Sequence, residues 1–310
     1  MIDFEKKNKI DGNERALYIR NKLKKLIEKN NVKSKIAIIQ VGNNFASNIY
    51  VNRKIKIANE IGISSKYIHF DDNITEDQLI NEIQKINNNN DITGIMVQLP
   101  LPININTFNV LISISQEKDI DGLHPFNAGL LHYSKIVPYS VNDVLYEKLS
   151  FDFIKNIGKN IPFIPCTPMG CLDLLQHEKT LTIQSKNAVV IGNSNLVGKP
   201  ISRLLIQSGA TVTTLHSKSK NVEYIIQNAD IIVSATGVGQ KLKKVKKTAI
   251  IIDVAIRNGN DGKICGDLNY NKLIKTNRIT PVPKGVGPMT IACLMVNSYL
   301  CGMKKNIKEN

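Results

Sequence analysis

The chain has 310 residues, enough for two domains that each bury their own core. Its hydrophobic content of 42% is ordinary for a globular protein, and no apolar run approaches the roughly 20 residues of a membrane span. The 41 lysines and arginines exceed the 26 acidic residues by 15, but they are dispersed among asparagines and isoleucines. We therefore expect small polyanionic ligands and no nucleic-acid partner.

The cysteines and the first residues both indicate a reducing compartment. The five cysteines are odd in number and lack the paired spacing of metal ligands, so we predict free thiols and no metal site. The segment from Met1 to Lys7 contains acidic side chains and no apolar core of a signal sequence. We expect a cytoplasmic protein without a membrane partner.

The first half of the chain alternates helix-period and strand-like segments, which is typical of the α/β class. Apolar spacing predicts helices over Asn13–Asn30 and Ala46–Glu60 and strands over Ile36–Val41 and Ile92–Leu99. The prolines at 100 and 102 break regular structure, and a loop is expected over 119–129. The weakly periodic stretch 132–162 is predicted to be an insertion, part helical and partly mobile.

The second half resumes this alternation from residue 187. It predicts a helix over Ile201–Ser208 and strands over Ala188–Ile191, Thr211–Leu215, Ile231–Ser234 and Ile250–Val254. The segment Thr290–Cys301 is apolar at helical spacing, and we expect it to pack back on the first domain.

Tyr50 and Lys54 are four residues apart, so on a helix they share a face. An aromatic ring beside an amine suits ring stacking and proton transfer, provided that burial lowers the lysine pKa. The alternative is an exposed helix with a solvated lysine, and spacing alone favours that alternative.

Gln98 interrupts an apolar strand just before the chain breaks at Pro100. Ligands bind at the carboxyl ends of strands in open α/β sheets, so an amide here could orient a ligand or a catalytic lysine. An amide that only caps its own loop is equally compatible.

Asp119 and Asp121 lie two residues apart before Gly122. One of these carboxylates can accept hydrogen bonds from an amino-substituted heterocycle. The alternative is a turn-forming role, which is common for aspartate before glycine.

The strand Ala188–Ile191 is followed at once by Gly192-x-Ser194-x-x-x-Gly198. A β-branched run, a glycine turn and a helix present backbone N–H groups to a dinucleotide pyrophosphate. The glycine spacing alone is frequent, so this signal is weak by itself.

The end of the second strand of this half carries His216, Ser217 and two lysines, and no acidic residue. Enzymes selective for NAD place a carboxylate there for the ribose 2′-hydroxyl. Its absence favours the 2′-phosphate of NADP. The alternative is that these residues cap the next helix and bind no nucleotide.

Taken together, the chain resembles the bifunctional methylenetetrahydrofolate dehydrogenase/cyclohydrolase family of the FolD type. The resemblance rests on six motifs that occur in the family's order and span nearly the whole chain: Tyr50-Val51-x-x-Lys54, Gly94-Ile95-Met96-Val97-Gln98-Leu99-Pro100-Leu101-Pro102, Lys118-Asp119-Ile120-Asp121-Gly122, Pro165-Cys166-Thr167-Pro168-x-Gly170, Val189-Val190-Ile191-Gly192-x-Ser194-Asn195-x-Val197-Gly198-x-Pro200, and Ile279-Thr280-Pro281-Val282-Pro283-x-Gly285-Val286-Gly287-Pro288-Met289-Thr290.

The resemblance implies NADP-dependent oxidation of 5,10-methylenetetrahydrofolate to the methenyl form and hydrolysis of that form to 10-formyltetrahydrofolate. These reactions belong to one-carbon metabolism and supply purine biosynthesis. It also implies a homodimer and two α/β domains flanking a cleft, the second of Rossmann type with a mainly parallel sheet. We expect a folate-binding domain over 1–165 plus 288–310 and an NADP-binding domain over 166–287.

The resemblance also assigns roles to residues. Lys54 resembles the general acid/base of the hydrolytic step, Gln98 would hold and tune it, Tyr50 would stack on the folate, and Asp121 would bind the pterin amines. The further substrate contacts implied are Val97, Leu99, Pro281, Gly285, Gly287 and Pro288. The implied cofactor contacts are Gly192, Asn193, Ser194, Gly198, His216, Ser217 and Ile256.

Three positions depart from the family pattern. Asn193 stands where many relatives have an arginine that can meet the 2′-phosphate, Lys284 replaces a glycine, and Ala255 stands where glycine is usual. These departures keep two alternatives open. One is a dehydrogenase that lacks the cyclohydrolase activity, and the other is a non-catalytic protein that binds NADP or folate.

Overall fold

The computed structural model describes residues 4–239, 242, 244–258 and 264–309. The chain forms two compact units. Unit 1 consists of Met1–Leu17, Ser134–Ser140 and Thr167–Ala292, and unit 2 consists of Tyr18–Tyr133, Val141–Cys166 and Cys293–Asn310. Compared with the predicted domains, Met1–Leu17 and Ser134–Ser140 cluster with the later half of the chain.

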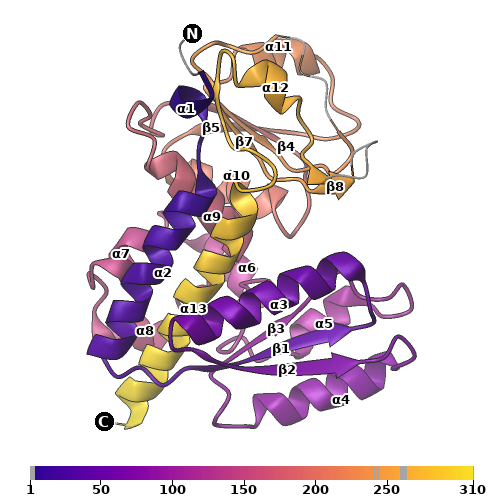
Figure 1. The fold of residues 1–310 in the computed structure, drawn as a ribbon, viewed down its shortest axis with the longest axis vertical. Helices are drawn as coiled ribbons and strands as arrows, with labels where there is room; N and C mark the ends of the chain where they lie inside the picture. Colours follow the sequence, from indigo (N-terminus) through magenta and orange to yellow (C-terminus); the bar gives the residue numbers. More distant parts are fainter. Residues whose placement is uncertain (1–3, 240–241, 243, 259–263, 310) are drawn as a thin grey trace. The chain divides into compact units, whose positions relative to one another are not determined.

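Unit 2 contains a parallel sheet in the order β2-β1-β3, formed by β1 (Lys35–Val41), β2 (Ser64–Phe70) and β3 (Gly94–Val97). Figure 1 shows α3 (Phe45–Glu60) and α4 (Glu76–Asn87) on opposite faces of this sheet. Apolar side chains of α4 and of α5 (Thr107–Ser113) pack against Ile39 and Ile95. The opposite face, with Gly94 and Met96, therefore leads on to Gln98 because side chains alternate along a strand.

β2, α4 and α5 of unit 2 are not among the elements predicted from the sequence. β2 is an edge strand with mostly exposed side chains, so it lacks the apolar run of β1. α4 does carry a sequence signal, because Thr75 and Gln78 form a capping box at its start. The loop expected over 119–129 is also wrong in its second half, since α6 (Pro125–Tyr133) begins there, with proline at its first position.

The stretch 132–162 contains α7 (Val141–Leu145) and α8 (Phe151–Asn156), so the helical part of its prediction is confirmed. Its apolar side chains enter the core, and Val141, Val144 and Ile157 are all below 4% exposed. The segment thus contributes to the folded core. Its interpretation as an insertion stays a prediction.

Unit 1 has a five-stranded parallel sheet in the order β10-β7-β6-β4-β5. Its strands are β4 (Asn187–Ile191), β5 (Thr211–Leu215), β6 (Ile231–Ser234), β7 (Ile250–Asp253) and β10 (Arg278–Ile279). The order runs outward from β4 in both directions, which is the arrangement of a Rossmann-type sheet with a switch point between β4 and β6. The expected α/β fold class is confirmed.

The remaining elements complete the two units. They are α1 (Phe4–Asn8), α2 (Gly12–Lys29), α9 (Cys166–Gln176), α10 (Gly198–Gln207), α11 (Val222–Gln227), α12 (Tyr270–Leu273), α13 (Val286–Glu309) and the antiparallel pair β8 (Arg257–Asn258) and β9 (Ile264–Cys265). α13 is long and apolar enough to cross a membrane by length and composition, but 89% of its apolar window is buried in the structure. It is a core helix of this fold.

Candidate functional site

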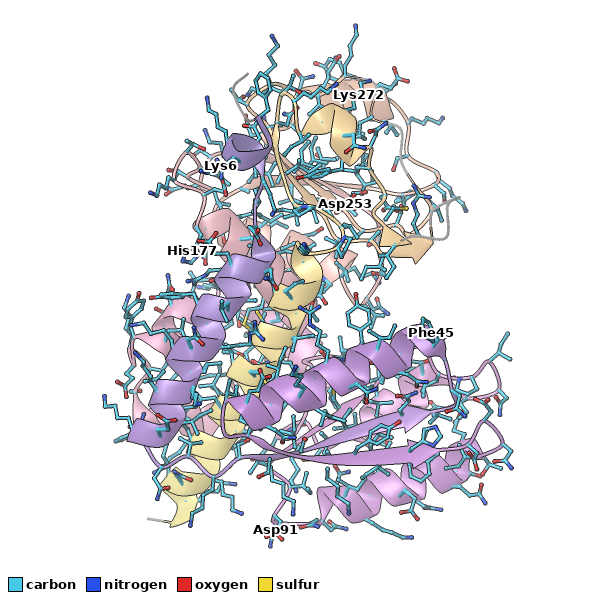
Figure 2. All side chains as sticks on the ribbon, viewed as in Figure 1. Lys6, Phe45, Asp91, His177, Asp253 and Lys272 are labelled. Atoms are coloured by element: carbon cyan, nitrogen blue, oxygen red, sulfur yellow. The ribbon has the colours of Figure 1, made fainter. Side chains whose placement is uncertain are left out.

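Tyr50 and Lys54 lie one turn apart on α3, as their spacing predicts. The helix begins after Asn44, whose side chain accepts the backbone N–H of Ser47, and Figure 2 labels Phe45 in its first turn. Lys54 is only 7% exposed, which excludes a solvated surface lysine. The lysine therefore has the burial that proton transfer requires.

Gln98 is the hydrogen-bond partner of Lys54. Lys54 Nζ donates a 2.9 Å bond to Gln98 Oε1, while Gln98 Nε2 donates a 2.6 Å bond to the carbonyl of Leu99. The second bond turns the amide so that its oxygen faces the lysine. The backbone N–H of Gln98 continues the β3 ladder to the carbonyl of Ile39 at 2.7 Å, so the pair lies at the carboxyl end of the sheet.

The electrostatics of this position favour the neutral amine. Burial lowers the pKa of Lys54 because the ammonium loses its hydration, and the interactions with Asp121 and Cys166 offset this effect only in part. Burial also raises the pKa of the Tyr50 hydroxyl, which keeps that ring uncharged. A neutral amine held by an amide oxygen can take a proton from water, which is the work of a general base.

The structure separates the roles of the two aspartates. Asp119 is 1% exposed and accepts bonds from the backbone N–H groups of Leu123 and His124 and from Asn127 Nδ2, so it forms the turn. Asp121 is partly exposed and acts electrostatically on Lys54. The carboxylate that remains for a ligand is therefore Asp121.

α13 closes this half of the site from inside unit 2. Asn297 is fully buried, and its Nδ2 donates bonds to the carbonyls of Ile120 at 2.8 Å and Ile164 at 3.1 Å. The thiol of Cys166 donates to the same carbonyl of Ile120 at 3.3 Å. Neither Asn297 nor Cys166 was assigned a role from the sequence. A polar residue within an apolar helix is the signal that could have found Asn297.

Val97 and Leu99, the predicted substrate contacts beside Gln98, differ in what they offer. The Val97 side chain is 1% exposed and belongs to the core formed with Leu79 and Ile83. A ligand could therefore meet Val97 only through its backbone. Leu99 bonds Gln98 through its carbonyl, which makes it a support of the amide.

In unit 1, the glycine turn after β4 is built as the motif predicts. Gly192 has a φ of +119°, and a Cβ there would lie 2.5 Å from the carbonyl oxygen of Ala235. A Cβ on Gly198 would lie 2.2 Å from the carbonyl oxygen of Gly192. The Ser194 hydroxyl accepts the N–H groups of Val197 at 3.2 Å and Gly198 at 3.4 Å, and α10 begins at Gly198. The turn is a cradle that side chains would fill, so it fits a pyrophosphate.

Asn193 and the residues that follow β5 are exposed to solvent. His216, Ser217 and Lys218 are exposed, and the His216 Nδ1 accepts the backbone N–H of Lys218 at 3.2 Å. This bond leaves the ring proton on Nε2 in the neutral imidazole. The strand end thus offers a hydroxyl, an imidazole and an ammonium to an anionic group.

The remaining predicted residues of unit 1 lie after β7 and β10. Ile256 is 45% exposed, which is unusual for a large aliphatic side chain and suits contact with a flat ring. Gly285 is packed against the carbonyl oxygen of Pro281, where a Cβ would lie at 2.4 Å. Pro288 is buried, and Gly287 is partly buried in the first turn of α13. Their substrate contacts stay predictions.

Two buried carboxylates at the ends of β6 and β7 are not among the residues predicted from the sequence. Asp253 is 3% exposed and Asp267 is 2% exposed. Asp253 follows three isoleucines in β7, and a charged residue at the end of an apolar strand is a signal for it. No equivalent signal marks Asp267.

Comparison with known proteins identifies both units. A family model described as the catalytic domain of tetrahydrofolate dehydrogenase/cyclohydrolase matches residues 10–121, and one described as the NAD(P)-binding domain of that family matches residues 165–306. The bifunctional protein FolD of Rickettsia canadensis is 42% identical over 298 residues, covering 94% of this chain and 95% of the relative. The bifunctional protein FolD of Staphylococcus epidermidis is 39% identical with the same coverage.

Solved structures agree with these matches. The bifunctional FolD of Campylobacter jejuni is 36% identical, with a TM-score of 0.82 over 94% of this chain and 97% of the other. A FolD from Trypanosoma brucei, solved in complex with NADP and an inhibitor, is 29% identical, with a TM-score of 0.80 over 97% of this chain and 98% of the other.

Proposed function

Because this chain belongs to the tetrahydrofolate dehydrogenase/cyclohydrolase family, we propose that the two half-sites described above carry out its two reactions. The chain is a bifunctional NADP-dependent enzyme of folate metabolism. It oxidises 5,10-methylenetetrahydrofolate to the 5,10-methenyl form and hydrolyses that product to 10-formyltetrahydrofolate. The observation that carries the proposal is the buried Lys54 amine held 2.9 Å from Gln98 Oε1.

In the hydrolytic step, Lys54 acts as the general base. A water molecule adds to the cationic methenyl carbon while the neutral amine of Lys54 takes its proton. The hydroxyl of this adduct then loses its proton as the formyl carbonyl forms, and the bond from the carbon to N5 breaks as the Lys54 ammonium returns a proton to N5. The formyl group stays on N10, and one proton is released to water overall. Asp121 accepts hydrogen bonds from the pterin amino groups, and the uncharged ring of Tyr50 stacks on the folate.

In the oxidative step, the residues of unit 1 bind and orient the dinucleotide. NADP⁺, when bound, accepts the hydride from the one-carbon bridge. Gly192, Asn193 and Ser194 meet the pyrophosphate through the turn, with Gly198 at the helix start. His216 and Ser217 meet the 2′-phosphate. Ile256 contacts the nicotinamide.

Location and assembly are further parts of the proposal. A cytoplasmic enzyme is supported by the burial of four of the five cysteines as thiols and by the burial of α13 in the fold. A homodimer is supported by β2, which within the described residues pairs on one side only, and by Tyr67 on it, which is 44% exposed. Sedimentation at several protein concentrations tests the dimer.

The substitution Lys54→Met tests the role of the amine. We expect hydrolysis of methenyltetrahydrofolate to fall by about 10²–10⁴-fold, the usual contribution of a general base. The methenyl product of the NADP⁺-dependent reaction should then accumulate, which absorbance measures. Lys56→Met is the control, because Lys56 is an exposed lysine of the same helix. Hydrolysis at the wild-type rate in Lys54→Met would contradict the proposed role.

A further inference from the structure

The loop after β6, from Thr236 to Gly239, lies at the switch point of the unit 1 sheet. β6 is the neighbour of β4, and the N–H of Ala235 donates a 2.8 Å bond to the carbonyl of Ile191. The carbonyl of Ala235 is also the atom that a Cβ on Gly192 would strike. The loop therefore lies directly beside the glycine turn, where dinucleotides bind in such sheets.

A single carboxylate, Asp267, gathers the polar groups of this loop. Its Oδ2 accepts bonds from the N–H of Thr236 at 2.9 Å, the hydroxyl of Thr236 at 2.8 Å, the N–H of Gly237 at 3.2 Å and the hydroxyl of Ser234 at 3.1 Å. Its Oδ1 accepts the N–H of Gly239 at 3.0 Å. Burial alone would raise the pKa of Asp267, but these bonds outweigh it and lower the pKa. The carboxylate is therefore ionised in its pocket.

Asp267 is in turn fixed to the end of the sheet. Asp253, the last residue of β7, accepts the backbone N–H of Asp267 at 3.0 Å and that of Leu268 at 2.9 Å. Gly266 has no room for a side chain, because a Cβ there would lie 2.2 Å from an Asp253 oxygen. Figure 2 labels Asp253 at this strand end. Two carboxylates therefore connect the loop to the sheet: Asp267 binds the loop, and Asp253 binds the backbone of Asp267.

The loop has a shape that needs such support. Gly237 and Gly239 have φ values of +74° and +78°, which are left-handed conformations that a free glycine loop leaves readily. Without a fixed partner, the loop would have to become ordered when the cofactor binds, and this entropic cost would weaken binding. With Asp267 in place, the loop is already ordered before any ligand arrives.

We propose that Asp267 is a positioning residue that shapes the Thr236–Gly239 loop as one wall of the cofactor pocket. This inference rests on the proposed function, but only on its cofactor half. Both carboxylate oxygens of Asp267 already accept hydrogen bonds from the loop, so Asp267 acts on the dinucleotide through Thr236, Gly237 and Gly239. Loss of its charge therefore weakens cofactor binding and leaves hydrolysis, which needs no dinucleotide, in place.

The substitution Asp267→Asn tests this role. The amide keeps one acceptor oxygen and turns an NH₂ group toward N–H donors, so the loop loses its anchor. We expect the Kd for NADPH, measured by the fluorescence of the bound nucleotide, to rise by about tenfold or more, as for loss of one charge-assisted bond. The KM for NADP⁺ should rise with it, whereas kcat and the cyclohydrolase rate should change by less than about twofold.

Thr236 offers a milder pair of variants if Asp267→Asn folds poorly. Thr236→Val removes the hydroxyl that donates to Asp267 at 2.8 Å and accepts the N–H of Val238 at 3.4 Å. We expect NADPH affinity to fall about threefold, while Thr236→Ser should restore it. Asp230→Asn is the matched control, because Asp230 also accepts a backbone N–H, that of Asn187 at 3.1 Å, but at the opposite end of the sheet. It should leave NADPH affinity unchanged.

The outcomes separate the two proposals. A wild-type chain that binds no NADPH would overturn the proposed cofactor site. A wild-type chain that binds NADPH with the same Kd as Asp267→Asn would overturn only the role of Asp267. A parallel loss of cyclohydrolase activity in Asp267→Asn would indicate a general folding defect, and the Thr236 variants would then decide. The same Kd for NADPH in Thr236→Val as in the wild type would overturn the role of Asp267.

Discussion

Lys54 and Gln98 are 44 positions apart in the chain, yet Lys54 Nζ donates a 2.9 Å hydrogen bond to Gln98 Oε1. The bond joins the middle of α3 to the end of β3, and the carbonyl of Leu99 fixes the amide from the other side. An amide oxygen accepts a hydrogen bond from the amine without adding a negative charge. The pair can therefore hold the lysine in place while its pKa stays low.

Gln98→Glu should move the pH profile of hydrolysis to higher pH. A carboxylate beside the amine favours the ammonium and raises the pKa of Lys54, so less neutral base is present near pH 7. We expect the cyclohydrolase rate at neutral pH to fall and to recover as the pH rises. Gln176→Glu is the control, because Gln176 is exposed on α9. A profile identical to that of the wild type would contradict a base role for Lys54.

Ser217→Asp should shift the cofactor preference toward NAD⁺. A carboxylate at this exposed strand end can bond a ribose 2′-hydroxyl and repels a 2′-phosphate. We expect the ratio of kcat/KM for NADP⁺ to that for NAD⁺ to fall by about tenfold or more, equivalent to about 1.4 kcal/mol. Thr211→Asp, at the amino end of β5, should leave the ratio unchanged. An unchanged ratio in Ser217→Asp would place the 2′-phosphate elsewhere.

Lys284→Gly should stabilise the chain. Lys284 has a φ of +84°, a left-handed conformation that strains a residue with a Cβ, and its carbonyl accepts the N–H of Asn13 at 3.0 Å. We expect the free energy of unfolding to rise by about 1 kcal/mol, measured by urea denaturation. Lys284→Ala keeps the Cβ, so it should bring no such gain. Equal stability of the two variants would show that the lysine is not strained.

Asp253→Asn should change how stability depends on pH. Burial raises the pKa of Asp253 from its ordinary 3.8 to about 6. Between these two values the folded chain keeps a proton that the unfolded chain releases, so this carboxyl makes the free energy of unfolding fall as the pH rises. Above about pH 6 both states are ionised and its effect becomes constant.

The variant lacks this titration. Relative to the wild type, Asp253→Asn should therefore gain about 2 kcal/mol of unfolding free energy between pH 4 and pH 6.5, on top of a constant loss from the altered hydrogen bonds. Urea unfolding at a series of pH values measures the difference. A difference that does not vary with pH would mean that Asp253 titrates at its ordinary pKa.

Local sequence patterns predict most of the unit cores and the turn after β4. Apolar runs mark β1, β4, β6 and β7 because both faces of these strands are buried. β2 is invisible to the same criterion, since as an edge strand it exposes side chains such as Tyr67. The start of α10 shifts by three residues, because Gly198 opens the helix ahead of the apolar run. α13 extends further beyond its predicted segment 290–301, from Val286 to Glu309.

Local sequence patterns do not predict the features of the site that depend on residues far apart in the chain. Spacing puts Tyr50 and Lys54 on one face but favours a solvated lysine, because burial depends on elements far away in the chain. The separate roles of Asp119 and Asp121 depend on Asn127 and on the turn N–H groups, which no two-residue pattern contains. Asp267 is harder still, because its five donors come from residues that precede it by about thirty positions.

The buried Asn297 has a consequence for how the polypeptide acquires its structure during synthesis. Its amide satisfies carbonyls of Ile120 and Ile164, which leave the ribosome 177 and 133 residues earlier. Until α13 emerges, those carbonyls lack the hydrogen bonds from the Asn297 amide. Completion of unit 2 therefore waits for nearly the whole chain, and such long-range closure is slow compared with the formation of local helices.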